Sequence, residues 1–138
     1  MARTEALIAG LGQDEALKRA QAYEAAGADL ILVHSKQKTP DEIEAFIKAW
    51  DGKVPIALVP TAYPQMTVAQ VRELKKVGLL IWGNHAIRAA VGAMRATFAQ
   101  IRRDGGIHGV EASIATVDAV FDLQRMGTVK ENEKRFLR

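Results

Sequence analysis

The sequence predicts an α/β fold built around a parallel sheet, and two observations support this. Four short apolar runs recur at intervals of about 25 residues, and a segment with helical spacing follows each of them. The last three runs contain almost no polar residue, which is typical of strands buried on both faces, as in parallel sheets. The runs are residues 6–9, 30–33, 56–59 and 79–82.

The first two helices are expected from their boundary residues. One begins near Gln13, followed by acidic residues at the end that favours negative charge, and Gly27 ends it. The next begins with a capping Thr39 and a proline, Pro40, at the first helical position. Glu42 completes the pattern of a capping box, in which a side chain returns a hydrogen bond to the cap.

Three further helices are expected in the second half of the chain. One begins at Thr67 and ends before Gly78, a long one covers residues 85–103, and a last one is capped by Thr116. No strand is expected after it. The long helix carries an apolar stripe at helical spacing, formed by Ile87, Val91, Met94, Phe98 and Ile101.

Alternation of strands and helices gives a parallel sheet with right-handed crossovers. It fits a short doubly wound sheet or half of an eight-stranded barrel, and periodicity alone does not choose between them. In both folds, ligands bind at the carboxyl ends of the strands. Polar residues at those ends are therefore the candidate functional residues.

Composition narrows the class of protein. The 138 residues, 49% hydrophobic and 25% charged, are typical of one globular domain. A net charge of +3, with basic and acidic residues interleaved, argues against nucleic-acid binding. The absence of cysteine excludes disulfides and thiolate metal sites. The apolar runs are too short to span a membrane and no signal-peptide pattern is present, so we expect a cytoplasmic protein without membrane contact.

The strand ends offer His34 as the foremost candidate. A histidine at the end of a buried strand can give a hydrogen bond or a proton to a substrate oxygen, although it can also be a core residue satisfied by a backbone carbonyl. Lys36 either neutralises a phosphate or lies in solvent. Tyr63, between prolines, either fixes its loop or contacts ligand. Asn84 and His85 are expected to cap the following helix. His108 lies in a glycine-rich loop, and nothing in the sequence around it indicates a functional role.

Arg3 lies in an apolar segment, where an unpaired guanidinium would be very costly. It needs an anion, and arginine recognises carboxylate or phosphate with two parallel hydrogen bonds. The alternative partner is Glu5, which shares one face of a strand with Arg3 at a period of two. The two interactions can coexist.

Common catalytic motifs are missing from the sequence. It contains no phosphate-binding P-loop, no dinucleotide-binding glycine motif, no zinc-protease motif and no nucleophile elbow. No cluster of carboxylates at the strand ends could hold a divalent ion. The residues alone thus indicate an anion pocket without a metal site.

At these strand ends the sequence resembles the phosphoenolpyruvate mutase and phosphonopyruvate hydrolase branch of the isocitrate lyase superfamily. The resemblance covers essentially the whole chain. It is carried by Ala2-Arg3-Thr4-Glu5-Ala6-Leu7-Ile8-Ala9-Gly10, Ala25-Ala26-Gly27-Ala28-Asp29, Val33-His34-Ser35-Lys36, Val59-Pro60-Thr61, Trp82-Gly83-Asn84-His85 and Ile87-Arg88-Ala89.

The resemblance implies a fold and two site residues. The fold is the carboxyl-terminal half of a (β/α)8 barrel, with residues 1–106 forming four βα units of a single domain. Residues 107–138 would be a helical extension exchanged between subunits. Arg3 matches the family arginine that grips the substrate's anionic end, and His34 matches the catalytic-site histidine near the phosphoryl group.

The resemblance also implies an activity. The expected enzyme is a mutase that interconverts phosphoenolpyruvate and phosphonopyruvate; the alternatives are phosphonopyruvate hydrolysis, a related carbon–carbon lyase and a non-catalytic half-barrel. The family uses Mg²⁺, whose ligands come from the first half of the barrel and not from these residues. The chain alone is therefore expected to be catalytically incomplete, and to form a homo-oligomer or pair with a missing amino-terminal half.

Overall fold

A computed structural model describes residues 1–137, which divide into two compact units, Met1–Ala86 and the residues from Ile87 onward. The division falls at the start of the long helix rather than at the predicted boundary between residues 106 and 107. In the structure, that helix is thus grouped with the carboxyl-terminal segment instead of with the sheet. The predicted boundary, which followed from treating strand and helix as one unit, stays a prediction.

The first unit contains a parallel four-stranded sheet. Its strands pair in the same order as they occur along the chain, whereas a doubly wound sheet reverses direction at a switch point. This order agrees with half of a barrel, and the half-barrel prediction is confirmed. The strands are β1 (Ala2–Thr4), β2 (Ile31–Val33), β3 (Ile56–Leu58) and β4 (Val77–Leu80).

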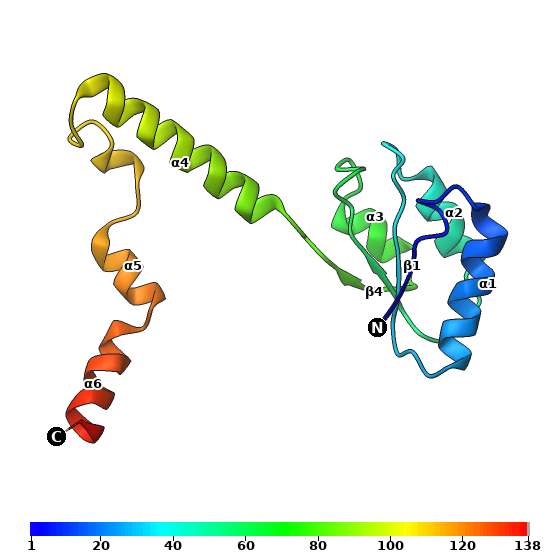
Figure 1. Ribbon diagram of the computed structural model, residues 1–138. Coiled ribbons are helices and arrows are strands. Elements are labelled where there is room, and N and C mark those ends of the chain that lie inside the picture. The colour runs from blue at the N-terminus through cyan, green and yellow to red at the C-terminus, as the bar shows by residue number, and fades with distance from the viewer. Residues whose placement is uncertain (138) are drawn as a thin grey trace. The chain divides into compact units, whose positions relative to one another are not determined.

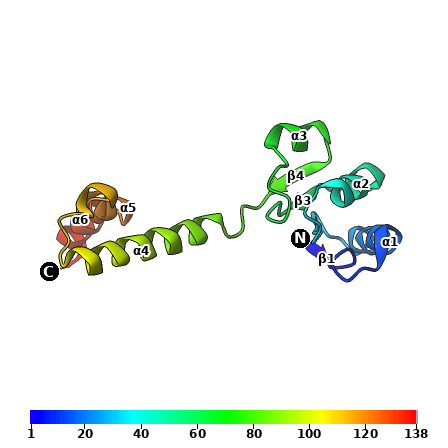
Figure 2. The same ribbon diagram turned by 90° about the horizontal axis from the view of Figure 1, so that it is seen from above.

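Three helices cover one face of this sheet, as Figures 1 and 2 show. They are α1 (Gly12–Ala25), α2 (Asp41–Ala49) and α3 (Val68–Glu73). The hydrophobic core lies between them and the strand residues that point towards them. Its largest fully buried side chains are Trp50, Tyr63 and Phe46.

The other face of the sheet is left without a covering layer of helices in this unit. The strand register places Arg3 beside Leu32, Leu32 beside Ala57, and Ala57 beside Leu79. These side chains alternate with the strand residues of the core cluster. In a closed barrel, this row would line the interior.

The first predicted strand is misplaced. Residues 6–9 form a turn, in which Ala9 N–H donates to the Glu5 carbonyl at 2.8 Å, and β1 lies four residues earlier. Ala6 and Leu7 are nonetheless buried in the core cluster. The apolar run reflects burial of a strand-to-helix turn, which periodicity does not separate from burial of a strand.

The helix starts were predicted with mixed success. Thr67 forms the expected cap, with a full capping box to Gln70. At α2 the predicted box is wrong: the side chain of Thr39 donates to Asp41 at 2.8 Å, and no side chain caps the helix. Gly27, with φ of +92°, follows α1 as expected.

The second unit contributes helices only. Thr116 caps one of them, accepting from Ala119 N–H at 3.1 Å, as predicted, whereas the last helix was not expected as a separate element. The elements are α4 (His85–Asp104), the short 3₁₀ helix η1 (Glu111–Ser113), α5 (Val117–Leu123) and α6 (Met126–Phe136). Within residues 1–137, no helix combines the length and apolar character needed to cross a membrane.

Candidate functional site

Arg3 and Glu5 form an ion pair at the carboxyl end of β1. The Arg3 Nε–H donates to Glu5 Oε1, as the period of two predicted, and both side chains are about half exposed. Arg3 lies within β1, and its side chain is half exposed, so the guanidinium does not bear the full cost of burial. Its terminal nitrogens have no partner among residues 1–137 and remain available to an anion.

His34 follows β2, the neighbour of β1, and lies in the electric field of the Arg3–Glu5 pair. Burial and the positive charge of Arg3 lower its pKa below the ordinary value of 6.5, while Glu5 raises it. Its Nδ1 is buried and has no hydrogen-bond partner in the described chain. The alternative of a core histidine held by a backbone carbonyl is therefore not found. A neutral imidazole beside a guanidinium can donate a hydrogen bond to a bound anion through one ring nitrogen and accept one from water through the other.

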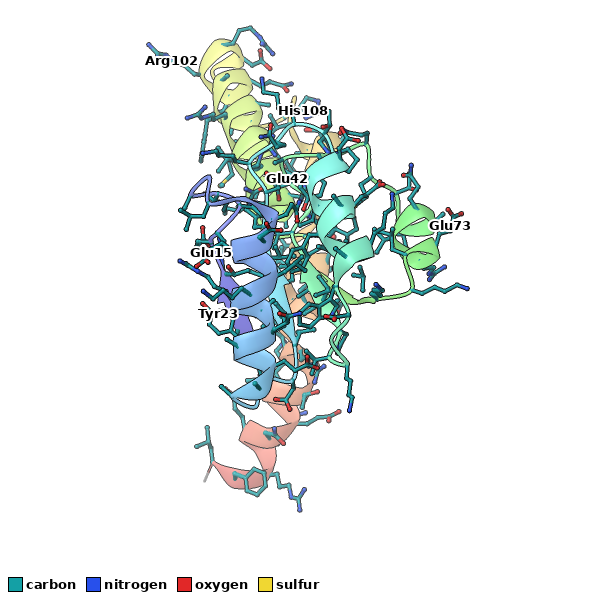
Figure 3. The ribbon with its side chains drawn as sticks, turned by 90° about the vertical axis from the view of Figure 1, so that its right-hand side faces the viewer. Glu15, Tyr23, Glu42, Glu73, Arg102 and His108 are labelled. Carbon is teal, nitrogen blue, oxygen red and sulfur yellow. The ribbon has the colours of Figure 1, made fainter. Side chains whose placement is uncertain are left out.

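The loop after His34 is tied to its surroundings on two sides. Lys36 Nζ donates to the Ile8 carbonyl at 2.7 Å, which links the loops after β1 and β2. The buried hydroxyl of Ser35 donates to Glu42, in the first turn of α2. Figure 3 labels Glu42. The sequence contained no signal for either contact, since Glu42 was assigned to a capping box. These ties hold His34 at the strand end.

Tyr63 is fully buried in the loop after β3. Burial raises the pKa of its hydroxyl to about 12, and this oxygen has no hydrogen-bond partner within residues 1–137. The ring belongs to the core cluster, which agrees with the prediction that it fixes its loop. The predicted alternative, contact with a ligand, stays a prediction.

The remaining residues that the sequence offered as candidates lie apart from Arg3, Glu5 and His34. Asn84 immediately precedes α4, and His85 is its first residue, with its ring edge-on to Trp82 at a centroid distance of 6.0 Å. His108 is exposed in the loop after α4. The candidate site therefore consists of Arg3, Glu5 and His34.

A magnesium site requires several oxygen ligands around one point. Within residues 1–137, no group of three or more histidine, cysteine, aspartate or glutamate side chains is close enough to hold a metal ion. Glu5, the acidic residue of the site, already accepts from Arg3. The residues described here therefore do not fit Mg²⁺ by themselves.

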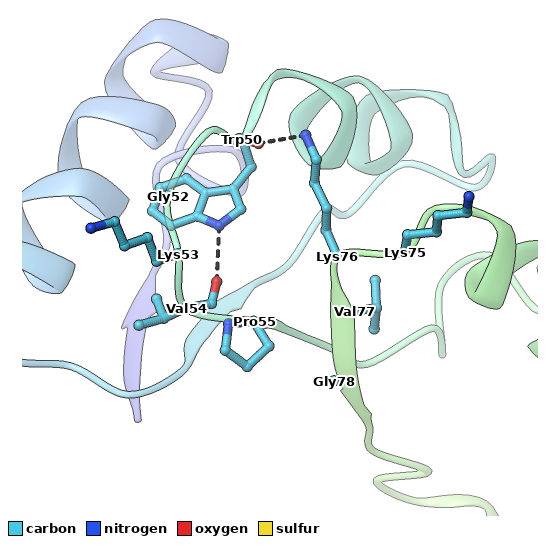
Figure 4. Close-up of a pocket in the computed structure, with 9 residues that line it drawn as sticks. All are labelled: Trp50, Gly52, Lys53, Val54, Pro55, Lys75, Lys76, Val77 and Gly78. Atoms are coloured by element: carbon cyan, nitrogen blue, oxygen red, sulfur yellow. Dashed lines mark hydrogen bonds between the residues drawn. The ribbon is translucent and has the colours of Figure 1, made fainter.

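A cavity of about 390 Å³ lies at the opposite edge of the sheet, at the amino ends of β3 and β4 (Figure 4). Three lysines contribute to its lining, but Lys76 is engaged in structure: its Nζ donates to the Lys48 carbonyl at 2.9 Å and to that of Trp50, at the end of α2. The Trp50 indole donates to the Val54 carbonyl at 3.0 Å. This edge of a parallel barrel serves stability, whereas ligands bind at the other.

Comparisons with known proteins place these features in a family. The family model described as phosphoenolpyruvate phosphomutase matches residues 1–102. The chain is 62% identical to a phosphonopyruvate hydrolase of Variovorax sp. (strain Pal2), over 100% of its length and 48% of the relative's. It is 47% identical to a phosphoenolpyruvate phosphomutase of Tetrahymena pyriformis, over 99% of its length and 45% of the relative's.

A solved structure agrees with these matches. The crystal structure of a phosphonopyruvate hydrolase in complex with oxalate and Mg²⁺ superimposes with a TM-score of 0.93 at 62% identity, covering 99% of this chain and 48% of that one. The chain spans about half the length of the relatives it matches. Because the family model matches most of the chain and the relatives match nearly all of it, the chain belongs to the phosphoenolpyruvate phosphomutase family.

Proposed function

We propose that this chain supplies the carboxyl-terminal half-barrel of an enzyme that hydrolyses phosphonopyruvate to pyruvate and phosphate. The observation that carries the proposal is Arg3, whose terminal nitrogens are unpaired in the described chain, beside His34 at the carboxyl ends of β1 and β2. The identity of 62% to a hydrolase, against 47% to a mutase, favours hydrolysis over the isomerisation expected from the sequence.

The proposed substrate carries negative charge at both ends, a carboxylate and a phosphonate. Arg3 binds one of these groups through two parallel hydrogen bonds. In hydrolysis a water oxygen bonds to phosphorus and the carbon–phosphorus bond breaks. Its electron pair stays on carbon as the pyruvate enolate, which then takes up a proton. His34 is neutral near pH 7 because its pKa is lowered, so it can accept a hydrogen bond or proton from the attacking water.

Magnesium is part of this proposal, since a related hydrolase has been crystallised with oxalate and Mg²⁺. Residues 1–137 hold no cluster of metal ligands. We infer that the ligands belong to the other half of the barrel, carried by a longer form of this protein or by a separate chain. Cytoplasmic location stays a prediction.

The exposed apolar side chains of this chain support the proposal that the half-barrel associates with another chain. Leu79, on the open face, and Trp82 are 40% and 54% exposed. Within its own unit, α4 leaves its apolar stripe largely uncovered, with Ile87 and Phe98 at 61% and 68% exposed. Such surfaces favour pairing with the missing half, or with a second copy of the chain.

The deciding experiment is reconstitution. The 138-residue chain is mixed with the amino-terminal half of the Variovorax relative and Mg²⁺, phosphonopyruvate is added, and the products are followed by ³¹P NMR. We expect inorganic phosphate, and its loss in Arg3→Met and His34→Ala. Phosphoenolpyruvate as the product would establish the mutase instead, which is the second candidate because the family model and the Tetrahymena relative are mutases.

A non-catalytic half-barrel is tested on the chain alone. Calorimetry with oxalate in the presence and absence of Mg²⁺ measures whether the isolated chain binds an enolate-like dianion. A purely structural role requires that oxalate and Mg²⁺ leave the chain unaffected. Our proposal expects weak oxalate binding that does not depend on Mg²⁺ and disappears in Arg3→Met, because the described residues provide an anion site but no metal site.

A further inference from the structure

The Arg3–Glu5 pair has a geometry that matters for anion binding. Glu5 accepts from Nε, at the side of the guanidinium, and not from the terminal nitrogens. Both terminal nitrogens lack a partner in the described chain, so the guanidinium keeps the edge that holds a planar anion with two parallel hydrogen bonds. Glu5 thus restrains Arg3 without occupying its binding edge.

Arg3 depends on such a restraint. Its side chain is about half exposed, and no second ion pair or hydrogen bond of this side chain is found within residues 1–137. An unrestrained arginine loses much rotamer freedom when it binds an anion, and this loss weakens binding. A carboxylate that fixes the guanidinium beforehand reduces the loss.

Glu5 is itself held by the backbone around it. Thr4, which is buried, accepts a hydrogen bond from Ala6 N–H through its hydroxyl at 3.2 Å. The carbonyl of Glu5 accepts from Ala9 N–H at 2.8 Å. The residue is therefore anchored on both sides by a turn packed on the core, although its carboxylate reaches solvent.

We propose that Glu5 is a positioning residue that aligns Arg3 for the substrate's anionic group. This inference rests on the proposed function, since it assigns Arg3 an anionic ligand. Loss of Glu5 would leave the Arg3 charge in place but release its orientation. We expect anion affinity to fall about 5–10-fold, a loss typical of one immobilised side chain.

The chain contains a matched control pair. On α1, Arg19 donates from Nε to Glu15 Oε1 at 2.6 Å, and both side chains are partly exposed (Figure 3 labels Glu15). This pair has the same side-on geometry but lies on a helix rather than at a strand end. Glu15→Ala therefore removes the same kind of contact without touching the candidate site.

The test is an NMR titration of the full 138-residue chain with oxalate and, separately, with methylphosphonate, following the Nε–H resonance of Arg3. In Glu5→Ala we expect this proton to exchange rapidly with water and the Kd of whichever anion binds to rise about 5–10-fold. Glu5→Gln keeps an acceptor oxygen and should restore both readouts to within about threefold of the unsubstituted chain. Glu15→Ala should match the unsubstituted chain.

Different failures are distinguishable. Anion binding that disappears in Arg3→Met but is unchanged in Glu5→Ala would overturn the positioning role and leave the proposed function intact. If neither anion perturbs Arg3 in the unsubstituted chain, the assignment of Arg3 to the substrate is wrong and the inference falls with it. Melting curves of each variant separate a loss of binding from a loss of fold.

Discussion

Lys36 and Ile8 are joined by a hydrogen bond of 2.7 Å between the lysine Nζ and the backbone carbonyl. The bond connects the loops that follow β1 and β2, and so connects the segment that bears Arg3 with the one that bears His34. From the sequence, Lys36 was expected either to bind phosphate or to lie in solvent. The structure gives it a third role, as a tie between the two loops of the candidate site.

Lys36→Met is the first prediction. The bond is exposed, so its loss should lower the free energy of unfolding by no more than about 1 kcal/mol. Oxalate binding should weaken severalfold, because Arg3 and His34 lose their fixed spacing. Urea denaturation and calorimetry measure the two effects. Lys38→Met removes a nearby exposed lysine as the control, and equal weakening in both variants would show that only net charge matters.

The second prediction concerns the protonation of His34. Burial and the nearby Arg3 keep its pKa below 6.5, and Glu5 opposes them. Arg3→Met should therefore raise the pKa of His34, and Glu5→Gln should lower it further. The ring protons of His34, followed by NMR between pH 4 and 8, measure both shifts. A rise in the Glu5→Gln variant would contradict the arrangement described here.

The lowered pKa of His34 also determines whether the protein becomes more or less stable as pH falls. As pH falls through 6.5, the unfolded chain takes up a proton at this histidine before the folded chain does. His34 therefore destabilises the fold progressively as pH falls, until the folded form is also protonated, and has no such effect above 6.5. His34→Gln should be less sensitive to acid in this range, as urea denaturation at several pH values would detect.

Local features were predicted well from the sequence. The ion pair between Arg3 and Glu5 followed from the period of two in a strand, and the Thr67 and Thr116 caps followed from their own residues and the residues just after them. All of these contacts join residues no more than three positions apart. Their geometry is set by the local backbone, which the sequence pattern specifies directly.

Contacts between distant residues were not predicted. The tie from Lys36 to Ile8 spans 28 positions, and the strand order required the family resemblance because periodicity does not say which strands pair. The apolar run of residues 6–9 was taken for a strand because a buried turn and a buried strand have the same composition. The Nδ1 atom of His34 is buried without a hydrogen-bond partner within residues 1–137. This property depends on residues packed around it from other parts of the chain, so no local sequence pattern predicts it.

Tyr63→Phe is the third prediction. The hydroxyl is fully buried and has no partner within residues 1–137, so it adds a desolvation cost without a compensating hydrogen bond. Its removal should raise the free energy of unfolding by about 1 kcal/mol. Tyr23→Phe, at a less buried tyrosine, should change it little. Destabilisation of Tyr63→Phe by more than about 1 kcal/mol would mean that the hydroxyl has a partner.

The fourth prediction tests the packing of Trp50. A Cβ at Gly52 would lie 2.0 Å from the indole ring, which is itself fully buried and hydrogen-bonded to Val54. Gly52→Ala should therefore lower the free energy of unfolding by about 2 kcal/mol, as overpacking does. At Gly83 the nearest atom would be 3.6 Å away, an ordinary contact, so Gly83→Ala should be tolerated. Similar losses at both sites would contradict the packing described here.

The last prediction concerns the open sheet. Four parallel strands in sequential order leave β1 and β4 as edges, and Leu79 lies 40% exposed on the uncovered face. We expect the chain to associate at micromolar concentration in analytical ultracentrifugation, and Leu79→Glu to shift it towards the monomer. Leu11→Glu places the same charge at another exposed leucine, before α1, and should leave association unchanged. A monodisperse monomer of the unsubstituted chain would show that the open face tolerates water, and that the half-barrel needs no partner to remain in solution.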